Sequence, residues 1–288
     1  MSIKIFIKAR GCLIALGIVV ISLIVLIFFA IDDRLEITNY ELTSSKLANP
    51  IKLAVLTDLH SCYYGAGQKE LIDAIEAGEP DVILLVGDIL DHKKPHTNTI
   101  ILLEAISPKY PCYYVTGNHE YWSGEVVAIK KMLRKHEVVV LEGNFEMIKI
   151  GDTYINICGV DDPSVNRSQE AGKSLHRQLK DLETVNNGSI YTVMLSHHPE
   201  LGNSYLQHPF DLILAGHAHG GQVRIPWLLD GLYAPNQGFF PQYTSGIYND
   251  PDMNMTMIVS RGLAKESDRF PRIFNRPELV FVTLNPAY

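Results

Sequence analysis

Residues 52–88, KLAVLTDLHSCYYGAGQKELIDAIEAGEPDVILLVGD, decide the expected fold because they contain a complete strand–helix–strand pattern. The apolar runs at 52–57 and 81–86 are typical of strands that are buried on both faces. Between them, residues 68–77 carry apolar side chains at helical spacing. Such a unit predicts two parallel strands joined by a helix, which indicates an α/β domain.

The same alternation continues toward the C-terminus. Further helices are expected at 98–106, 125–135 and 174–183, and further strands at 112–116, 145–150, 153–158, 191–195, 211–214, 256–260 and 279–284. Gly151-Asp152 between two of these strands indicates a hairpin. Residues 220–255, rich in Gly, Pro, Tyr and Asn, predict a long irregular surface. We therefore expect one α/β domain over residues 51–288, with largely parallel strands and a lead-in segment over 32–50.

Residues 11–31 contain no charged side chain and are rich in Ile, Leu, Val and Phe. As a helix this stretch would be roughly 30 Å long, about the thickness of the hydrocarbon core of a bilayer. A buried core helix and a cleaved signal peptide are the alternatives. A signal peptide has a shorter apolar region of about 7–15 residues and a small-residue cleavage site. A transmembrane anchor is therefore favoured.

Charges flanking this segment predict its orientation. Lys4, Lys8 and Arg10 precede it in a basic tail at residues 1–10, whereas Asp32 and Asp33 follow it. The positive-inside rule places the N-terminus in the cytoplasm and the large domain outside it. An odd number of cysteines in that domain, namely Cys62, Cys112 and Cys158, leaves at least one thiol unpaired.

Net charge argues against nucleic acid as a partner. The chain of 288 residues has a formal charge of −7, and residues 1–31 contribute +3 of it, so the remainder carries −10. Nucleic-acid-binding domains present a basic surface to the phosphates. A nuclease is therefore disfavoured, although it remains an alternative.

Five strand-like runs are each followed by side chains that bind metals. The segments in order are Asp58-Leu59-His60, Gly87-Asp88, Gly117-Asn118-His119-Glu120, Ser196-His197-His198 and Gly216-His217-Ala218-His219. Ligand sites of open α/β sheets form outside the carboxyl ends of the strands, so these segments are expected to converge. The mixture of oxygen and imidazole ligands suits Zn, Mn or Fe.

These segments resemble the signature of the calcineurin-like metallophosphoesterase superfamily, which is D-x-H, G-D, G-N-H-[DE], a single H, and G-H-x-H. The resemblance implies a four-layer α/β/β/α sandwich, which in this chain would follow the expected N-terminal transmembrane helix, and a site for two divalent metal ions (Mn, Zn or Fe). The implied ligands are Asp58, His60 and His219 for one metal, Asn118, His197 and His217 for the other, and Asp88 for both.

The resemblance also implies a mechanism. A hydroxide that bridges the metals would attack phosphorus, Asp88 would offset the repulsion between the cations, and a protonated His119 would donate to the leaving oxygen. Glu120 is expected either to orient His119 or to be a solvated loop acid. His197 fits the single-histidine position better than His198, which is left as a neighbouring or substrate-binding group.

Several residues outside the expected metal ligands are candidates for contacts with the substrate. Arg224 and Arg261 are candidates for bidentate contacts to phosphate, and so are Arg269, Arg272 and Arg276; surface salt bridges are the alternative for all five. Asp161-Asp162 is expected either to border the site or to form an ordinary turn. Aromatic residues of the irregular region would line a groove for a lipid-linked substrate, rest on the bilayer or form a loop core: Trp227, Tyr233, Phe239, Phe240, Tyr243 and Tyr248.

Residues 216–226, GHAHGGQVRIP, together with 260–262 and 276–279, are similar to a bacterial branch of membrane-attached or exported phosphohydrolases. Some members of that branch cleave the pyrophosphate of UDP-2,3-diacylglucosamine. The expected function is a membrane-anchored dimetal hydrolase of a phosphodiester or pyrophosphate bond. A non-catalytic metal-binding protein of the cell envelope is the alternative from a different class.

Overall fold

The computed structural model describes residues 2–167, 173–185, 188–205, 208, 210–250, 255–265 and 270–287. The helices are α1 Ser2–Ala30, α2 Lys69–Ala77, α3 Thr97–Ile106, α4 Asn118–Trp122, α5 Val126–Lys135, α6 Leu175–Asp181 and α7 Gly202–Tyr205. The strands are β1 Glu36–Ser44, β2 Ile51–Leu56, β3 Val82–Val86, β4 Cys112–Val115, β5 Val139–Val140, β6 Asn144–Ile150, β7 Thr153–Gly159, β8 Tyr191–Leu195, β9 Leu212–Ala215, β10 Tyr233–Ala234, β11 Gly238–Phe239, β12 Gly246–Asp250, β13 Met255–Val259 and β14 Glu278–Pro286. The expected helices and strands are therefore confirmed, apart from small shifts of their ends.

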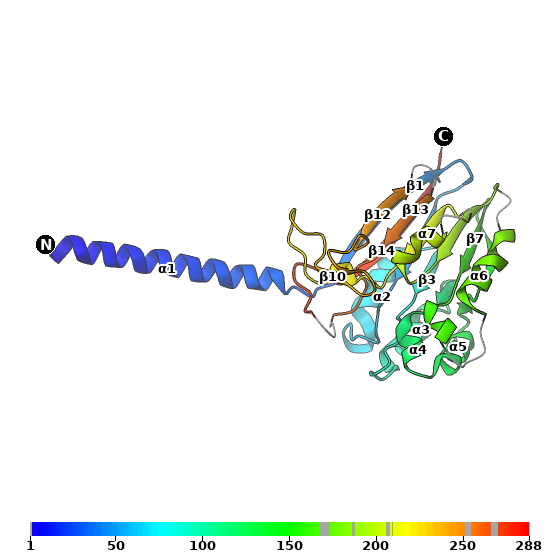
Figure 1. Ribbon diagram of the computed structural model, residues 1–288, viewed down its shortest axis with the longest axis horizontal. Helices are drawn as coiled ribbons and strands as arrows, with labels where there is room; N and C mark the ends of the chain where they lie inside the picture. The colour runs from blue at the N-terminus through cyan, green and yellow to red at the C-terminus, as the bar shows by residue number, and fades with distance from the viewer. Residues whose placement is uncertain are drawn as a thin grey trace.

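Two six-stranded sheets form the frame of the domain (Figure 1). The first has the order β1-β14-β2-β3-β4-β5 and the second β12-β13-β9-β8-β7-β6. Strands β2 to β5 of the first sheet and β7, β8, β9 and β13 of the second are parallel to their neighbours within each run. The β6–β7 pair is antiparallel around Gly151-Asp152, which confirms the hairpin.

Three apolar clusters show that the domain has four layers. The middle cluster lies between the sheets and joins Leu53 and Leu84 of the first sheet to Val193 of the second. The outer clusters pack helices on the sheets: α2, α3 and α5 on the first, and α6 and α7 on the second. The expected α/β/β/α sandwich is therefore confirmed.

The segment at 32–50 differs from the expected lead-in because it contains a long strand of the first sheet. Strand β1 runs parallel to β14, from Glu36 opposite Glu278 to Ser44 opposite Pro286. Its side chains alternate between half-buried and exposed, and those of Tyr40 and Leu42 pack against the cluster between the sheets. Because most residues of this strand are polar, the sequence pattern did not predict it. The folded domain therefore begins at about Glu36 instead of residue 51.

The region at 220–255 is less irregular than expected. It contains the short β10–β11 pair and strand β12, which pairs with β13. Tyr243 and Tyr248 form part of a loop core with ring centroids 5.0 Å apart, whereas Trp227 and Phe240 are exposed. The three cysteines of the domain are free and buried.

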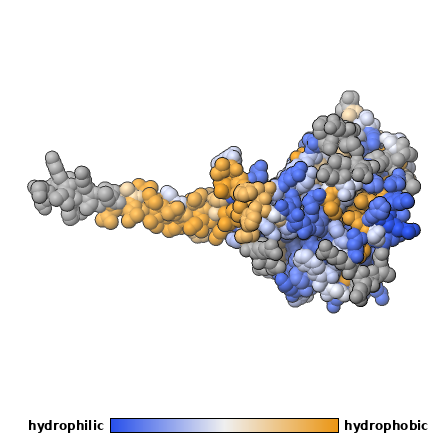
Figure 2. All heavy atoms as spheres, in the orientation of Figure 1, coloured by the Kyte–Doolittle hydropathy of each residue, from blue (hydrophilic) through white to orange (hydrophobic). Residues whose placement is uncertain are grey.

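Helix α1 projects away from the sandwich, and the sequence window Leu13–Ala30 is long and apolar enough to cross a membrane (Figure 1). None of this window is buried against the protein, and Figure 2 shows it as a continuous apolar rod. The backbone amide of Phe274 donates to the carbonyl of Ala30 at 2.7 Å. The Arg276 guanidinium donates to the carbonyls of Arg34 and Leu35 at 2.9 and 3.0 Å. The end of α1 is thus attached directly to the domain.

Candidate metal centre

The predicted site residues converge at the carboxyl ends of strands from both sheets. Asp58 and His60 follow β2, and Asp88 follows β3. Asn118 and His119 begin α4 after β4, His197 follows β8, and His217 and His219 follow β9. The backbone is left-handed, with φ between 47° and 65°, at Asp58, His60, Asp88, His217 and His219. Non-glycine residues adopt this conformation rarely, and such residues cluster at functional sites.

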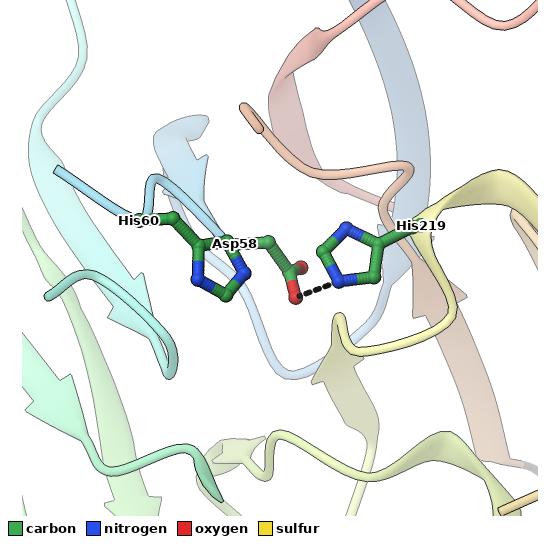
Figure 3. Close-up of side chains that lie close together, drawn as sticks. All are labelled: Asp58, His60 and His219. Atoms are coloured by element: carbon green, nitrogen blue, oxygen red, sulfur yellow. Dashed lines mark ion pairs between the residues drawn. The ribbon is translucent and has the colours of Figure 1, made fainter. Parts of the chain in front are cut away.

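The first group of ligand-type side chains is formed by Asp58, His60 and His219 (Figure 3). One ligand atom from each lies within 4.8 Å of the others. Nε2 of His219 is 3.6 Å from Oδ1 of Asp58. The Asp58 carboxylate is completely buried and accepts the backbone amide of His217 at 3.1 Å. Three donors around one point are suited to a divalent cation.

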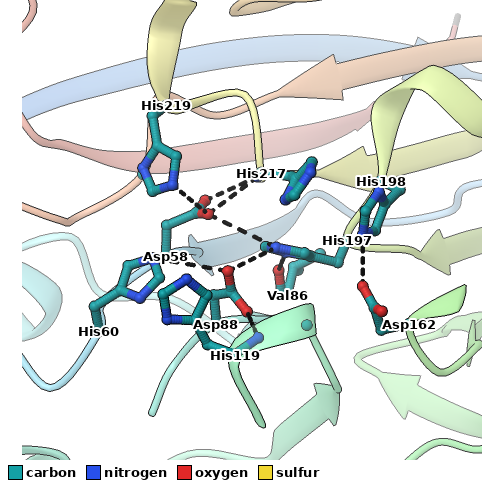
Figure 4. Close-up of polar contacts among 12 residues, drawn as sticks. Asp58, His60, Val86, Asp88, His119, Asp162, His197, His198, His217 and His219 are labelled. Carbon is teal, nitrogen blue, oxygen red and sulfur yellow. Dashed lines mark hydrogen bonds and ion pairs between the residues drawn. The ribbon is translucent and has the colours of Figure 1, made fainter. Parts of the chain in front are cut away.

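The second group is Asp88, His197 and His217, whose ligand atoms also lie within 4.8 Å of one another. Figure 4 shows Asp88 between the two groups. Oδ2 of Asp88 is 3.1 Å from Nε2 of His197 and 3.7 Å from Nε2 of His60. One carboxylate can therefore serve both groups.

His197 is oriented by the end of β3. Its Nδ1 lies 3.0 Å from the carbonyl oxygen of Val86, so that nitrogen carries the proton and donates it. Its Nε2 faces the carboxylates of Asp58 and Asp88, at 3.8 and 3.1 Å. A histidine that ligates a metal usually has its second nitrogen fixed in this way.

Two glycines of the segments leave room for the carboxylates. A Cβ at Gly117 would lie 2.2 Å from Oδ1 of Asp88, and a Cβ at Gly216 would lie 2.4 Å from Oδ2 of Asp58. Both distances are far below van der Waals contact. The glycines before Asn118 and His217 are therefore required by the close approach of the carboxylates to the backbone.

Several buried polar atoms of the site fit bound cations. Oδ1 of Asn118 and Nε2 of His60 are buried and have no hydrogen-bond partner within the described residues. Buried polar groups without a partner are rare in proteins, and a metal ion would supply one. Burial lowers the pKa of His219 to about 3 and that of His217 well below its usual value. Neutral imidazole is the form that binds metals, so the donor set fits the expected pair of ions.

His119 faces the same cluster without belonging to either group of three described above. Its backbone amide donates to Oδ1 of Asp88 at 2.8 Å, and its Nδ1 lies 3.3 Å from Oδ2 of Asp91. Burial lowers the pKa of His119, but the bond to Asp91 and the charge of Asp88 outweigh it and raise the pKa above the usual value. These neighbours thus favour the protonated form of His119.

Asp91 replaces Glu120 as the acid that orients His119, so the expectation for Glu120 was wrong. The completely buried Glu120 carboxylate accepts the backbone amides of Gly117, Leu90 and Asp88 at 2.8, 3.0 and 3.1 Å. Glu120 is the third residue of α4, and an acid at that position commonly turns back to the residue before the helix. It ties two loops of the site together. The sequence analysis did not identify Asp91, although Asp91 lies only three residues after Asp88.

His198, the alternative to His197, has acidic partners on both ring nitrogens. Its Nε2 lies 2.5 Å from Oδ2 of Asp162 and its Nδ1 lies 2.6 Å from Oε1 of Glu200. It is buried behind His217, with ring centroids 3.9 Å apart. Asp162 also accepts the amide of Ser164 at 2.7 Å, which identifies the ordinary turn that was the alternative.

The arginines predicted to bind phosphate have protein partners instead. Arg261 pairs with Glu278 at 2.9 Å and with Glu36 at 3.1 Å, and Arg224 donates to the hydroxyl of Ser245 at 2.5 Å. Arg272 and Arg276 donate to backbone carbonyls, and Arg269 lies outside the described residues. Sequence alone could not show these partners because they come from distant segments.

A cavity of about 540 Å³ opens over the cluster. It is lined by His60, Asp88, Asp91, Lys93, Lys94, Asn118, His119, Trp122, His217, His219, Gln222, Tyr233, Pro235 and Asn236. The two lysines come from the loop after β3, Trp122 is the last residue of α4, and Tyr233 to Asn236 come from the segment around β10. Sequence reasoning missed Lys93, Lys94, Trp122 and Asn236, which lie outside the five segments.

A family model for the calcineurin-like phosphoesterases matches residues 51–221, the range that contains every ligand-type residue described above. This chain belongs to the calcineurin-like phosphoesterase family. The family is one of metal-dependent phosphoester hydrolases with a dimetal centre. The expected family and the general class of activity are therefore confirmed.

Two relatives in sequence agree with this assignment. An uncharacterized metallophosphoesterase of Campylobacter jejuni is 30% identical over 279 residues, which cover 93% of this chain and 69% of the relative. A transmembrane protein with a metallophosphoesterase domain from Bos taurus is 30% identical and covers 61% of this chain and 41% of the relative. The solved NAD nucleotidase NadN of Haemophilus influenzae is 14% identical, with a TM-score of 0.49, over 74% of this chain and 45% of NadN.

The chain spans only part of several relatives, for example 50% of two metallophosphoesterases from Helicobacter pylori. The names of the relatives found by sequence specify no phosphoester substrate. The narrower similarity to enzymes that cleave UDP-2,3-diacylglucosamine is not shown by them and stays a prediction.

Proposed function

We propose that this phosphoesterase is anchored in a membrane and hydrolyses a phosphodiester or pyrophosphate bond with two divalent metal ions, of Mn, Zn or Fe. The observation that carries the proposal is the shared carboxylate of Asp88, which lies between two groups of ligand-type side chains. His119 lies beside Asp88 with its proton held by neighbouring acids. A site of this kind combines electrostatic stabilisation with a proton donor.

Each residue has a defined task in this proposal. Asp58, His60 and His219 would hold one ion, Asn118, His197 and His217 would hold the other, and Asp88 would serve both. Bound ions would supply a nucleophile from water near neutral pH and neutralise charge on the phosphoryl oxygens. Asn118 would add a ligand oxygen without adding negative charge. His119, fixed by Asp91, donates a proton to the leaving oxygen.

The membrane part of the proposal is supported by α1. Its apolar window is completely unburied and ends at the acidic residues Asp32 and Asp33, whereas the basic Lys4, Lys8 and Arg10 lie at its start. This charge asymmetry supports a cytoplasmic N-terminus and an extracytoplasmic catalytic domain.

The cavity supports an amphiphilic phosphoester as substrate, such as a lipid-linked one. Its volume of about 540 Å³ suits a head group better than a macromolecule, and the rings of Trp122 and Tyr233 provide apolar walls. Lys93 and Lys94 at the rim add positive charge for a phosphate. The net charge of −10 outside the anchor argues against nucleic acid.

The test uses the full chain in lipid nanodiscs loaded with Mn. Hydrolysis of p-nitrophenyl phosphate, bis-p-nitrophenyl phosphate and a nucleoside-diphospho-lipid is compared between the unaltered chain, Asp88→Asn and Asp152→Asn. We expect Asp88→Asn to lower turnover by at least about a thousandfold, because several kcal/mol of charge stabilisation is lost. The exposed Asp152 in the β6–β7 turn is the matched control and should have no effect.

The relative rates identify the bond. Preference for the diphospho-lipid supports a pyrophosphatase, and preference for the simple diester supports a phosphodiesterase. Two bound metals without turnover of any phosphoester would replace the proposal with the non-catalytic metal-binding protein. Efficient cleavage of DNA in the same assay would replace it with a nuclease.

A further inference from the structure

An exposed tryptophan occupies the tip of a hydrogen-bonded turn after the metal-site segment. The amide of Ile225 donates to the carbonyl of Leu229 at 2.9 Å, and the amide of Leu229 donates back to Ile225 at 2.8 Å. Between them, Trp227 is 103% exposed and Leu228 is 80% exposed. Trp227 has a φ of 63°, which is unusual for a bulky residue. A defined backbone thus presents large apolar side chains to the surroundings.

A second apolar tip lies at the end of β11. Phe239 is 61% exposed and Phe240 is 72% exposed, and Phe240 again has a positive φ, of 56°. The amide of Phe240 donates to the carbonyl of Leu232 at 2.9 Å, which ties this tip to the segment that follows Trp227. We call Trp227, Leu228, Phe239 and Phe240 the apolar rim.

The apolar rim lies on the side of the domain from which α1 departs. The gold loops around β10 project toward α1 and reach the level of its last turns (Figure 1). In Figure 2 the apolar colour of the helix continues onto the adjoining edge of the domain. The bonds of Phe274 to Ala30 and of Arg276 to Arg34 hold residues 274–276 against the end of α1, and the amide of Arg224, three residues before Trp227, donates to the carbonyl of Ile273 at 2.9 Å.

We propose that the apolar rim is a second membrane contact, which inserts into the interfacial region of the bilayer that α1 crosses. The inference rests on the anchoring in the proposed function. A bilayer, and not a protein, is the occupant because the rim continues the apolar surface of α1 and is tied to its end. Aromatic side chains are the residues that favour the membrane interface.

Docking of the rim places the cavity at the bilayer surface. Tyr233, Pro235 and Asn236 line the cavity, and they lie between the two tips in the sequence. The ring of Tyr233 also contacts that of Phe239, with centroids 5.5 Å apart. Insertion of the rim therefore holds one wall of the cavity beside the head groups. The substrate consistent with this position is an amphiphile that remains in the bilayer.

The test measures tryptophan fluorescence of the full chain in nanodiscs that contain brominated lipids. In a Trp122→Phe variant, Trp227 is the only tryptophan. We expect bromolipids to quench its emission at least twofold, and the emission to be blue-shifted relative to the same protein in urea. The matched control is Trp227→Phe, which retains the partly exposed Trp122 of the cavity and should be quenched much less.

An unquenched Trp227 with the emission of a water-exposed indole would overturn the inference. The same quenching is also measured in the unaltered chain, so that the result does not depend on the folding of either variant. Only the part of its emission that comes from Trp227 should be quenched. Hydrolysis of bis-p-nitrophenyl phosphate by the unaltered chain is measured in parallel. Turnover without quenching would refute the proposed membrane contact but not the proposed activity. Quenching without turnover would refute the proposed activity but not the membrane contact.

Discussion

The two sheets contribute different chemistry to one site. The first sheet supplies Asp58, Asp88 and Asn118, which are oxygen donors, and also His60. The second supplies only imidazoles, from the loops after β8 and β9. Neither set contains enough ligands for two ions, so the site exists only where the sheets pack together. Apolar packing between the sheets is therefore a condition for metal binding as well as for stability.

The largest expected difference between the contributions of the two sheets is that between the variants Asp88→Asn and His217→Gln. Asp88 of the first sheet lies between both groups, whereas His217 of the second belongs with one. We expect Asp88→Asn to lose both metals and at least about a thousandfold in activity, and His217→Gln to retain one metal. Atomic emission spectroscopy gives the number of metals per chain. Equal metal loss in the two variants would refute the shared position of Asp88.

A somewhat smaller loss is expected from His119→Asn, which removes a proton donor of the first sheet without removing a ligand. General acid catalysis contributes roughly 10² to 10⁴-fold. The loss should be large for an alkyl ester and small for a p-nitrophenyl ester, whose leaving group needs no proton. Metal content should stay unchanged. A loss that is independent of the leaving group would contradict the assigned role.

Asp91→Asn should have a still smaller effect, of about 10- to 100-fold, as is typical of groups that orient a functional histidine. The same dependence on the leaving group is expected, because Asp91 acts through His119. Rates for alkyl and p-nitrophenyl esters measured side by side provide the check. Asp73→Asn is the matched control, since Asp73 is an exposed acid on α2 that pairs only with Lys69 among the described residues.

The smallest effect on activity is expected from Thr116→Val, which tests the contact between the sheets away from the ligands. The Thr116 hydroxyl donates to Asp161 at 2.8 Å and accepts the amide of Asp162 at 2.9 Å. Its removal leaves the buried amide of Asp162 without this partner, whereas Asp161 keeps Lys130 at 2.7 Å, and the expected cost is about 1–3 kcal/mol of unfolding free energy. Thermal unfolding should occur several degrees lower, whereas turnover should change less than about twofold. A large loss of turnover would show that the loops of the site depend on this bond.

The ligand-type residues could be predicted from sequence because each follows an apolar strand, and the ends of parallel strands meet. The hydrogen-bond and ion-pair partners of long side chains could not be predicted in this way. Arg261 has a guanidinium group that could bind phosphate, yet it pairs with Glu278 and Glu36. Glu120 turns back to Gly117 and not toward His119 because it is the third residue of α4, a short helix that the sequence analysis did not predict. Strand β1 was missed because its alternation rests on Tyr40 and Leu42 among polar residues.

The pairing of β1 with β14 sets an order for biosynthesis. Glu36 lies opposite Glu278, so the strand beside the anchor must wait for a partner made 242 residues later. At about 5–20 residues per second, translation takes roughly 12–50 s to reach that partner. Strand β2 waits as well, because β14 lies between β1 and β2. A growing chain would thus carry two unpaired strand edges until synthesis is nearly complete, and a ribosome stalled before β14 would leave them open to aggregation.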